Sequence, residues 1–595
     1  MSESGPRRRT WWPLIMAVVV GLVASLLLYE LLDEDGSAAA CVPLEISVST
    51  EKDELLADLA ADYNAAAEDS DGPCAKVTVH GLTSGAAMEA LIGGWGAAKT
   101  GTPEPQVWLP STSLWLARMA ARGSSDIVVT QENPSVAASP LVIAMPEEMA
   151  AQVRTRTPDP GWADILSLAT APGGWASLGK PEWGEFTLAR DNPLLSSSGL
   201  GASVATFHAG ATSAKVRLDG DAVGNAEVLK FVRGVESSVT RYGNDAALFV
   251  EQLAEDDRLG TPPISAIVMQ EELAYLYNRG VAGKGPAEAE RGGTPPNRPF
   301  AVIHPREGTL VFDHPFVVLA SASPEQREAA ADFLAFLGEP EQRDRFRTLG
   351  FRDADAVDRP TPQLQEALGL SADGGLAVIQ PPAGRVVESL VDAWGATRRH
   401  ARVLLVLDVS GSMAQIANPD SVDAEIAGRT KVSLLPGAVA RALELLSPVD
   451  EVGLWTFSTG RTEAVPVQSL SKNRDALLDT VGALRARGET DLYQTVSAAH
   501  AKMIGELDGD RINAVVVLSD GANTPADATA RQRLLDAVST DNSEVPLPVY
   551  TISFGADADR TTMAAIAKQS GALHYAAVDD PENIDEVFAA VFSHF

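Results

Sequence analysis

Residues 402–412 read RVLLVLDVSGS, an apolar run followed at once by an acidic, hydroxyl-rich turn. The run from Arg402 to Leu407 predicts a buried strand. Asp408, Ser410 and Ser412 then supply a carboxylate and two hydroxyls within one turn, where Gly411 eases the bend. All three are hard oxygen ligands of the kind that suit a small divalent cation. This stretch therefore predicts a strand that ends in a metal-ligating loop.

Two later segments complete the same pattern. Thr490 lies in a Gly-Glu-Thr-Asp turn, and Asp520 follows a second apolar run from Asn513 to Leu518. In an open parallel sheet, ligands bind beyond the carboxyl ends of the strands, near a switch in strand order. If the strands before Asp408 and Asp520 are neighbours, their carboxylates converge on one ion. Each piece alone also fits an ordinary turn with capping side chains, so the prediction rests on all the pieces together.

The C-terminal third alternates strands and helices, which predicts a doubly wound α/β sheet. Residues 401–595 resemble a von Willebrand factor type A domain with a complete metal-ion-dependent adhesion site. The resemblance implies that Ser410, Ser412 and Thr490 ligate Mg²⁺ (or Mn²⁺ or Ca²⁺) directly. It implies that Asp408 and Asp520 ligate directly or through water, and that a partner carboxylate takes the open position. The expected strands are 402–407, 452–457, 514–518 and 549–554, and the expected helices are 432–446, 474–484, 491–504 and 585–592.

The preceding part of the chain has its own βα alternation, which begins with a short strand at Leu44–Ser49 and an amphipathic helix at Asp53–Ala67. The order of several segments over 44–382 resembles an extracellular solute-binding protein of the type II periplasmic-binding-protein class, near the molybdate-binding group. The segments that carry the resemblance are 44–48, 82–85, 191–193 with the serine run that follows, 313–319, 329–337 and 350–351.

That resemblance implies two α/β lobes within residues 42–382. The first lobe is expected over about 42–140 and 300–382, and the second over about 141–299. A ligand cleft is expected between the lobes, with a hinge near Pro140 and Phe300. Residues 383–400 are expected to be a linker that contains a short helix.

Hydroxyl side chains recur where the loops of this domain run into helices. Hydroxyls and free backbone N–H groups at helix starts favour anions, but serine also caps helices everywhere, and the two interpretations have similar weight. Glu271 and Glu272 are expected at a solvated helix start. The candidate solute-binding residues are Thr83, Ser84, Ser111, Ser113, Ser196, Ser197 and Ser198.

The N-terminus predicts a membrane anchor. Residues 11–32 are almost wholly apolar and long enough to cross a bilayer. Three arginines at 7–9 precede the span, which places residues 1–10 in the cytoplasm and the body outside the cell. The three alanines at 38–40 also suit a signal peptidase, so cleavage is an alternative to a retained single-pass anchor.

The two cysteines fit an exported protein. An oxidising exterior permits a disulfide between Cys41 and Cys74, which would close a loop worth roughly 3 to 4 kcal/mol in the chain-entropy model. A lipid-modified Cys41 is the alternative, although Ala38 and the distant apolar span suit that signal poorly.

Composition narrows the function further. The formal charge of −33 disfavours nucleic acid as a partner, and the chain has no nucleophile turn or phosphate loop. The sequence therefore predicts a non-catalytic, membrane-anchored extracellular protein that couples a solute-binding-like module to Mg²⁺-dependent partner binding or adhesion. The alternatives are the receptor of an ABC-type importer with an accessory domain and, with less support, a factor that inserts metal into another protein.

Overall fold

The computed structural model describes residues 41–68, 74–96, 100–129, 133–260, 263–283, 285–371, 375–419, 428–540, 547–577, 584–592 and 594–595. The predicted membrane span at 11–32 lies outside these residues. Within the part that is described, no helix combines the length and the apolar character that a membrane crossing requires.

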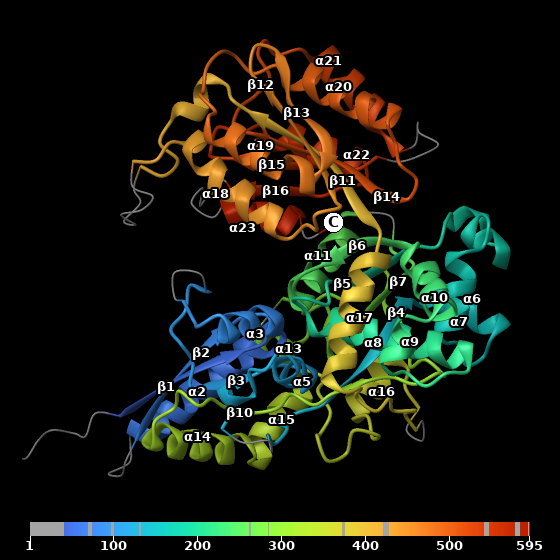
Figure 1. Ribbon diagram of the computed structural model, residues 1–595, viewed down its shortest axis with the longest axis vertical. Helices are drawn as coiled ribbons and strands as arrows, with labels where there is room; N and C mark the ends of the chain where they lie inside the picture. Colours follow the sequence, from blue (N-terminus) through green and yellow to red (C-terminus); the bar gives the residue numbers. More distant parts are fainter. Residues whose placement is uncertain are drawn as a thin grey trace, which may run out of the picture.

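Three sheets organise the molecule, and each has its own layer of helices (Figure 1). The first sheet has the order β10-β3-β1-β2. The strands β1, β2 and β3 are parallel, and β10, which follows the second sheet's strands in the chain, pairs antiparallel with β3. Buried apolar residues alternate along β1, because one strand face packs on helices. The strands of this sheet are β1 (Val42–Val48), β2 (Ala75–Gly81), β3 (Val107–Leu109) and β10 (Val317–Val318).

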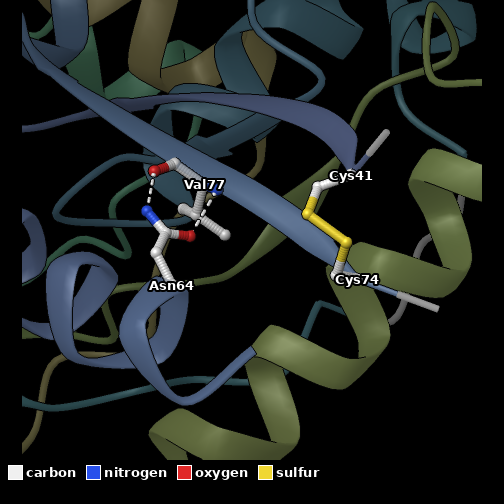
Figure 2. The surroundings of a disulfide bond; sticks show 4 residues. All are labelled: Cys41, Asn64, Cys74 and Val77. Atoms are coloured by element: carbon white, nitrogen blue, oxygen red, sulfur yellow. Dashed lines mark hydrogen bonds between the residues drawn. A yellow bond between two sulfur atoms is a disulfide. The ribbon is translucent and has the colours of Figure 1, made fainter. Parts of the chain in front are cut away.

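Helices cover the first sheet and tie its ends together. Asn64 on α2 donates from Nδ2 to the backbone oxygen of Val77 at 2.9 Å, and its Oδ1 accepts from the Val77 backbone N–H at 2.8 Å. These bonds satisfy the backbone of the edge strand β2. The disulfide Cys41–Cys74 joins the starts of β1 and β2 on the same side (Figure 2). The helices here are α2 (Asp53–Glu68), α3 (Ser84–Ile92), α5 (Leu114–Ala121), α14 (Pro324–Leu337) and α15 (Pro340–Thr348).

The second sheet has the order β6-β5-β7-β4-β8, and β9 pairs with the start of β4. Every residue of β4 is buried, because this strand lies in the interior of the sheet. The hinge positions predicted near Pro140 and Phe300 fall at the start of β4 and at the start of β8. Its strands are β4 (Ser139–Pro146), β5 (Leu188–Asp191), β6 (Val239–Gly243), β7 (Ala266–Gln270), β8 (Phe300–Ile303) and β9 (Val311–Phe312).

The serine run leads directly into a helix of the second lobe, which begins at Ser197 and extends to Ala214. The helices are α6 (Glu147–Arg156), α7 (Trp162–Ala169), α8 (Ser197–Ala214), α9 (Gly220–Val223), α10 (Ala226–Glu236), α11 (Ala246–Leu259), α12 (Glu271–Asn278), α13 (Pro286–Arg291) and α16 (Pro362–Leu368).

The predicted linker is a helix, α17 (Gly384–Thr397), that packs against both lobes. Gly384 lies so close to the backbone oxygen of Ala117 on α5 that no side chain fits there. Glu388 forms an ion pair with Arg118 of α5, and Trp394 meets Tyr242 of β6 edge-on at 5.8 Å between ring centroids. The helix then runs directly into the third sheet, as Figure 1 shows in yellow.

The third sheet has the order β13-β12-β11-β14-β15-β16. Its four central strands match the expected strands closely, but the edge strands β13 and β16 were not predicted. β13 pairs antiparallel with β12 in an otherwise parallel sheet. The strands are β11 (His400–Asp408), β12 (Glu451–Phe457), β13 (Arg461–Ser469), β14 (Arg511–Ser519), β15 (Val549–Phe554) and β16 (His574–Ala577), and the helices are α18 (Lys431–Glu444), α19 (Leu470–Gly482), α20 (Leu492–Gly505), α21 (Ala528–Val538), α22 (Arg560–Gln569) and α23 (Ile584–Phe592).

Candidate functional site

The carboxyl ends of β11 and β14 meet at one edge of the third sheet. The two strands are parallel neighbours, with Leu407 opposite Leu518. After β11 the chain continues to β12 on one side, and it returns to β14 on the other, so the strand order switches between β11 and β14. Asp408 ends the first strand and Asp520 follows the second. The topology therefore brings both predicted carboxylates to the switch point, where open α/β sheets bind ligands.

Asp408 is fully buried and held by two hydrogen bonds. Its Oδ1 accepts from the backbone N–H of Ser410 at 2.8 Å, and its Oδ2 accepts from Ser519 Oγ at 2.6 Å. Burial raises the pKa of Asp408 to about 6, although these bonds oppose the rise. Ser519 was not predicted as part of the site, yet it fixes the orientation of the carboxylate.

The hydroxyls of the first loop lie beside the second carboxylate. Ser410 Oγ is 3.0 Å from Ser412 Oγ, and Ser412 Oγ donates to Asp520 Oδ1 at 2.7 Å. Asp520 is fully buried and Ser410 nearly so. One chain of hydrogen bonds thus connects the loop after β11 with the loop after β14.

Thr490 reaches the same place from a third loop. A Cβ atom added at Gly521 would lie 3.6 Å from Thr490 Oγ1 and 3.7 Å from Ser412 Oγ, so both hydroxyls flank this glycine. The backbone N–H of Gly411 donates to the backbone oxygen of Gly488 at 2.9 Å. This bond joins the loop after β11 to the loop that carries Thr490. The structure therefore brings together all five side chains that the sequence proposed as metal ligands.

A lysine that sequence reasoning missed completes this cluster. Lys431 begins α18, and its Nζ donates to Asp520 Oδ2 at 2.8 Å and to Gln415 Oε1 at 3.1 Å. Only 4% of Lys431 is exposed. A signal was present in the sequence, because Lys431 shares the apolar stripe of the helix with Leu434, Leu435 and Ala438, where a charged residue needs a buried partner.

The donor set fits a small hard cation. It combines two carboxylates with three hydroxyls, two of which lie within van der Waals contact of a Cβ atom placed at Gly521. Among the described residues, no group of three or more His, Cys, Asp or Glu side chains is placed to hold a metal ion, and this site contributes two carboxylates. A metal at the sheet edge would thus depend on hydroxyls and water as well as carboxylates, as Mg²⁺ sites often do.

Two of the hydroxyls predicted to bind a solute form a hydrogen bond between the two lobes. Ser84 of the first lobe and Ser197 of the second lie 3.2 Å apart between their Oγ atoms. Ser84 Oγ also accepts from the backbone N–H of Ser111 at 3.2 Å, and Ser197 Oγ accepts from Trp115 Nε1 at 2.8 Å. Close to them, the Gly85 N–H donates to the Leu195 oxygen at 2.9 Å.

The remaining predicted solute residues have varied surroundings. Ser196 Oγ donates to Asp191 Oδ2 at 2.9 Å, and burial raises the pKa of that aspartate to about 7. Ser113 contributes its backbone N–H, which donates to Asp313 Oδ1 at 2.7 Å. Ser198 Oγ is buried without a hydrogen-bond partner among the described residues. Thr83 stands at the N-cap of α3 but makes no side-chain capping bond.

The prediction for Glu271 and Glu272 is wrong, because both side chains are fully buried at the start of α12. Glu271 pairs with Arg352 through two bonds of 2.6 and 2.7 Å and with His304 at 2.9 Å. Glu272 accepts from Ser139 Oγ, and burial raises its pKa to about 8. Sequence periodicity missed this arrangement because the partners come from distant segments.

A pocket of about 180 Å³ opens between the lobes, bordered by the start of α2 on one side and by α11 and α12 on the other. Its polar lining is mostly acidic, with Glu51, Asp53, Glu54 and Glu251 around a single Lys52. Lys52 is buried and held by Ser49 and Glu51. The hydroxyl residues predicted to bind a solute do not line this pocket, and its carboxylates would repel an anion.

Comparison with known proteins assigns both halves of the chain. The family model for bacterial extracellular solute-binding proteins matches residues 44–352, and the model for the von Willebrand factor type A domain matches residues 403–590. A Mycobacterium tuberculosis protein, described only as uncharacterized, is 27% identical over 586 residues, which cover 94% of this chain and 79% of the relative.

Two solved structures illustrate the two parts. The periplasmic binding protein AfuA from Actinobacillus pleuropneumoniae, with bound fructose-6-phosphate, is 12% identical with a TM-score of 0.40, over 60% of this chain and 98% of that chain. A von Willebrand factor type A protein from Catenulispora acidiphila is 18% identical with a TM-score of 0.27, over 33% of this chain and 42% of that chain. The second match spans less than half of that protein.

Proposed function

Since this chain belongs to the bacterial extracellular solute-binding protein family and carries a von Willebrand factor type A domain after it, we propose that it is a non-catalytic binding protein outside the cytoplasm. One module faces a small solute, and the other grips a protein partner through a divalent cation. The observation that carries the proposal is the convergence of five oxygen-bearing side chains at the switch point of the third sheet.

In this proposal Ser410, Ser412 and Thr490 hold Mg²⁺, or Mn²⁺ or Ca²⁺, directly. Asp408 and Asp520 hold it directly or through water. The bound ion supplies an electrophilic position for a carboxylate of the partner. Other residues of the chain support the site. Ser519 orients Asp408, and the hydrogen bond between Gly411 and Gly488 joins the loop after β11 to the loop that carries Thr490.

The segment before residue 41 anchors the protein in the membrane in this proposal, with residues 1–10 in the cytoplasm and the body outside the cell. The disulfide between Cys41 and Cys74 supports an extracellular body, because such bonds persist in oxidising compartments.

A second candidate function is the receptor of an ABC-type importer, and the pocket between the lobes favours it. That pocket has room for a small molecule, and both lobes line it. In this alternative the metal-binding domain is an accessory, and the solute itself is the cargo.

The metal site is tested by thermal unfolding of the full chain with Mg²⁺ and with a chelator. Mg²⁺ is expected to raise the melting temperature of the wild type, because an ion that binds only the folded state stabilises it. Asp408→Ala and Asp520→Ala are expected to abolish the rise. Asp475→Ala removes an exposed carboxylate of α19 and should leave the rise intact. Equal shifts in all four proteins would reject the site.

The two candidate functions separate in a capture experiment from the native cell envelope. Adhesion predicts a protein partner that is retained in Mg²⁺, lost in chelator and lost with Ser412→Ala. The importer predicts instead a small ligand, detected by calorimetry against sugars, amino acids, amines and oxyanions, whose binding is unaffected by Ser412→Ala.

A further inference from the structure

The buried ammonium of Lys431 lies beside the proposed metal site and donates a hydrogen bond to Asp520. It contacts the side of Asp520 that Ser412 leaves free, since Ser412 donates to Oδ1 and Lys431 donates to Oδ2. Side-chain exposure is 5% for Lys431 and 0% for Asp520. Both oxygens of this carboxylate are therefore used, one toward the hydroxyls of the site and one toward the lysine.

The fold makes room for this lysine at the end of a third strand. Gly555 follows β15 with φ +81°, a left-handed conformation that favours glycine. A Cβ atom at this position would lie 2.8 Å from Lys431 Cε and 3.0 Å from its Nζ. Gln415, from the loop after β11, accepts a second bond from the ammonium at 3.1 Å. Segments from both sides of the switch point thus fix the charge where it is.

We propose that Lys431 sets the charge of the site, so that a bound divalent ion favours an anionic partner. This inference rests on the proposed function. Two carboxylates alone would nearly neutralise the ion, whereas two carboxylates and one ammonium leave it a net positive charge. That charge weakens the protein's hold on the metal and strengthens the metal's hold on an anion at the open position, because both interactions are Coulombic and lie in a poorly solvated place.

The test is calorimetric titration of Mn²⁺ into the full chain and its Lys431→Met variant. Methionine keeps most of the volume of the side chain and removes the charge. The variant is expected to bind Mn²⁺ about tenfold more tightly or better, since a like charge near the ion is gone. Lys431→Arg keeps the charge and is expected to bind Mn²⁺ like the wild type.

A second measurement reports how the charge of Lys431 affects anion binding at the metal. Acetate is the probe for the open position, and broadening of its methyl proton signal by the Mn²⁺-loaded protein reports contact. The wild type is expected to broaden acetate more than Lys431→Met at equal metal occupancy. A lysine that only packs the fold would change the melting temperature in chelator and leave this difference at zero.

Gly555→Ala is an independent variant, because it displaces the ammonium while the lysine stays in the chain. It is expected to shift Mn²⁺ affinity in the same direction as Lys431→Met. Normal Mn²⁺ binding by the wild type with equal or weaker binding by both variants would overturn this inference alone. No Mn²⁺ binding by the wild type would remove the proposed function and this inference with it.

Discussion

Hydroxyl-bearing loops follow parallel strands at two places in this molecule, and they perform different tasks. At the edge of the third sheet, Ser410, Ser412 and Thr490 gather around two carboxylates. Between the lobes, the hydroxyls of Ser84 and Ser197 form a hydrogen bond with each other. The difference teaches that the residue type at a strand end does not set its role. The role of each loop depends on the segment that faces it. At the third sheet this segment is the loop that carries Asp520, and between the lobes it is a loop of the other lobe.

The largest effect is expected on removing the positive charge of Arg352, which pairs with the buried carboxylate of Glu271. Arg352→Met leaves Glu271 buried without its two short bonds, which is expected to lower the free energy of unfolding by about 3–5 kcal/mol. Denaturant unfolding of the full chain measures it. The double variant with Glu271→Gln should recover part of the loss, and Arg343→Met, which breaks a more exposed pair, should cost under about 1 kcal/mol. Equal losses for Arg352→Met and Arg343→Met would contradict the structural role.

Next in size is a pH effect from the buried carboxyl group of Glu272. Burial raises the pKa of Glu272 from 4.5 to about 8. The folded state therefore holds this proton more tightly than the unfolded state, and the stabilising contribution present below pH 4.5 is lost as the pH rises through 8. Between pH 6 and pH 9 the wild type should lose on the order of 2–3 kcal/mol more than Glu272→Gln. Parallel pH profiles for the two proteins, measured by denaturant unfolding, would refute this.

A pair of serine variants compares the two places directly. Ser197→Ala deprives Trp115 Nε1 of its buried acceptor and is expected to cost about 1–3 kcal/mol, while the thermal shift on adding Mg²⁺ persists. Ser412→Ala is expected to do the reverse, with little loss in chelator and no Mg²⁺ shift. Calorimetric melting curves of both variants, with and without Mg²⁺, measure each effect. If both variants lose the Mg²⁺ shift, the two places are coupled and the contrast fails.

The smallest effect is expected at Ser113, because its backbone N–H, and not its hydroxyl, makes the bond to Asp313. Ser113→Ala should change the free energy of unfolding by less than about 0.5 kcal/mol. Denaturant unfolding checks this value. A loss above about 1 kcal/mol would show that the hydroxyl also contributes to stability.

Much of the fold followed from local pattern. The apolar runs predicted the four central strands of the third sheet, since buried parallel strands have continuous apolar sequences. The edge strands β13 and β16 were missed because Arg461–Ser469 is largely exposed and His574–Ala577 is short, so neither has a continuous buried run. The sequence predicted a short helix in the linker, but the packing of α17 on both lobes depends on partners that its own sequence does not indicate.

The sequence predicted which oxygen-bearing side chains lie at the candidate metal site, but it did not predict the positive charge beside them. Asp408 and Asp520 stand directly after apolar runs, so their place at a strand end was readable. The apolar stripe that Lys431 shares indicated a buried partner for this lysine, but only the folded chain reveals that Asp520 and Gln415 lie against it.

The sequence by itself determined the alternation of strands and helices and the oxygen-rich turns at strand ends, because both depend on residues near one another in the chain. Only the tertiary structure decided which turns meet. It set Ser84 against Ser197 across the lobes, buried Glu271 and Glu272 and placed an ammonium beside Asp520. The physical reason is that hydrogen bonding and electrostatic energy in a poorly solvated interior depend on distances between segments that are remote in the chain.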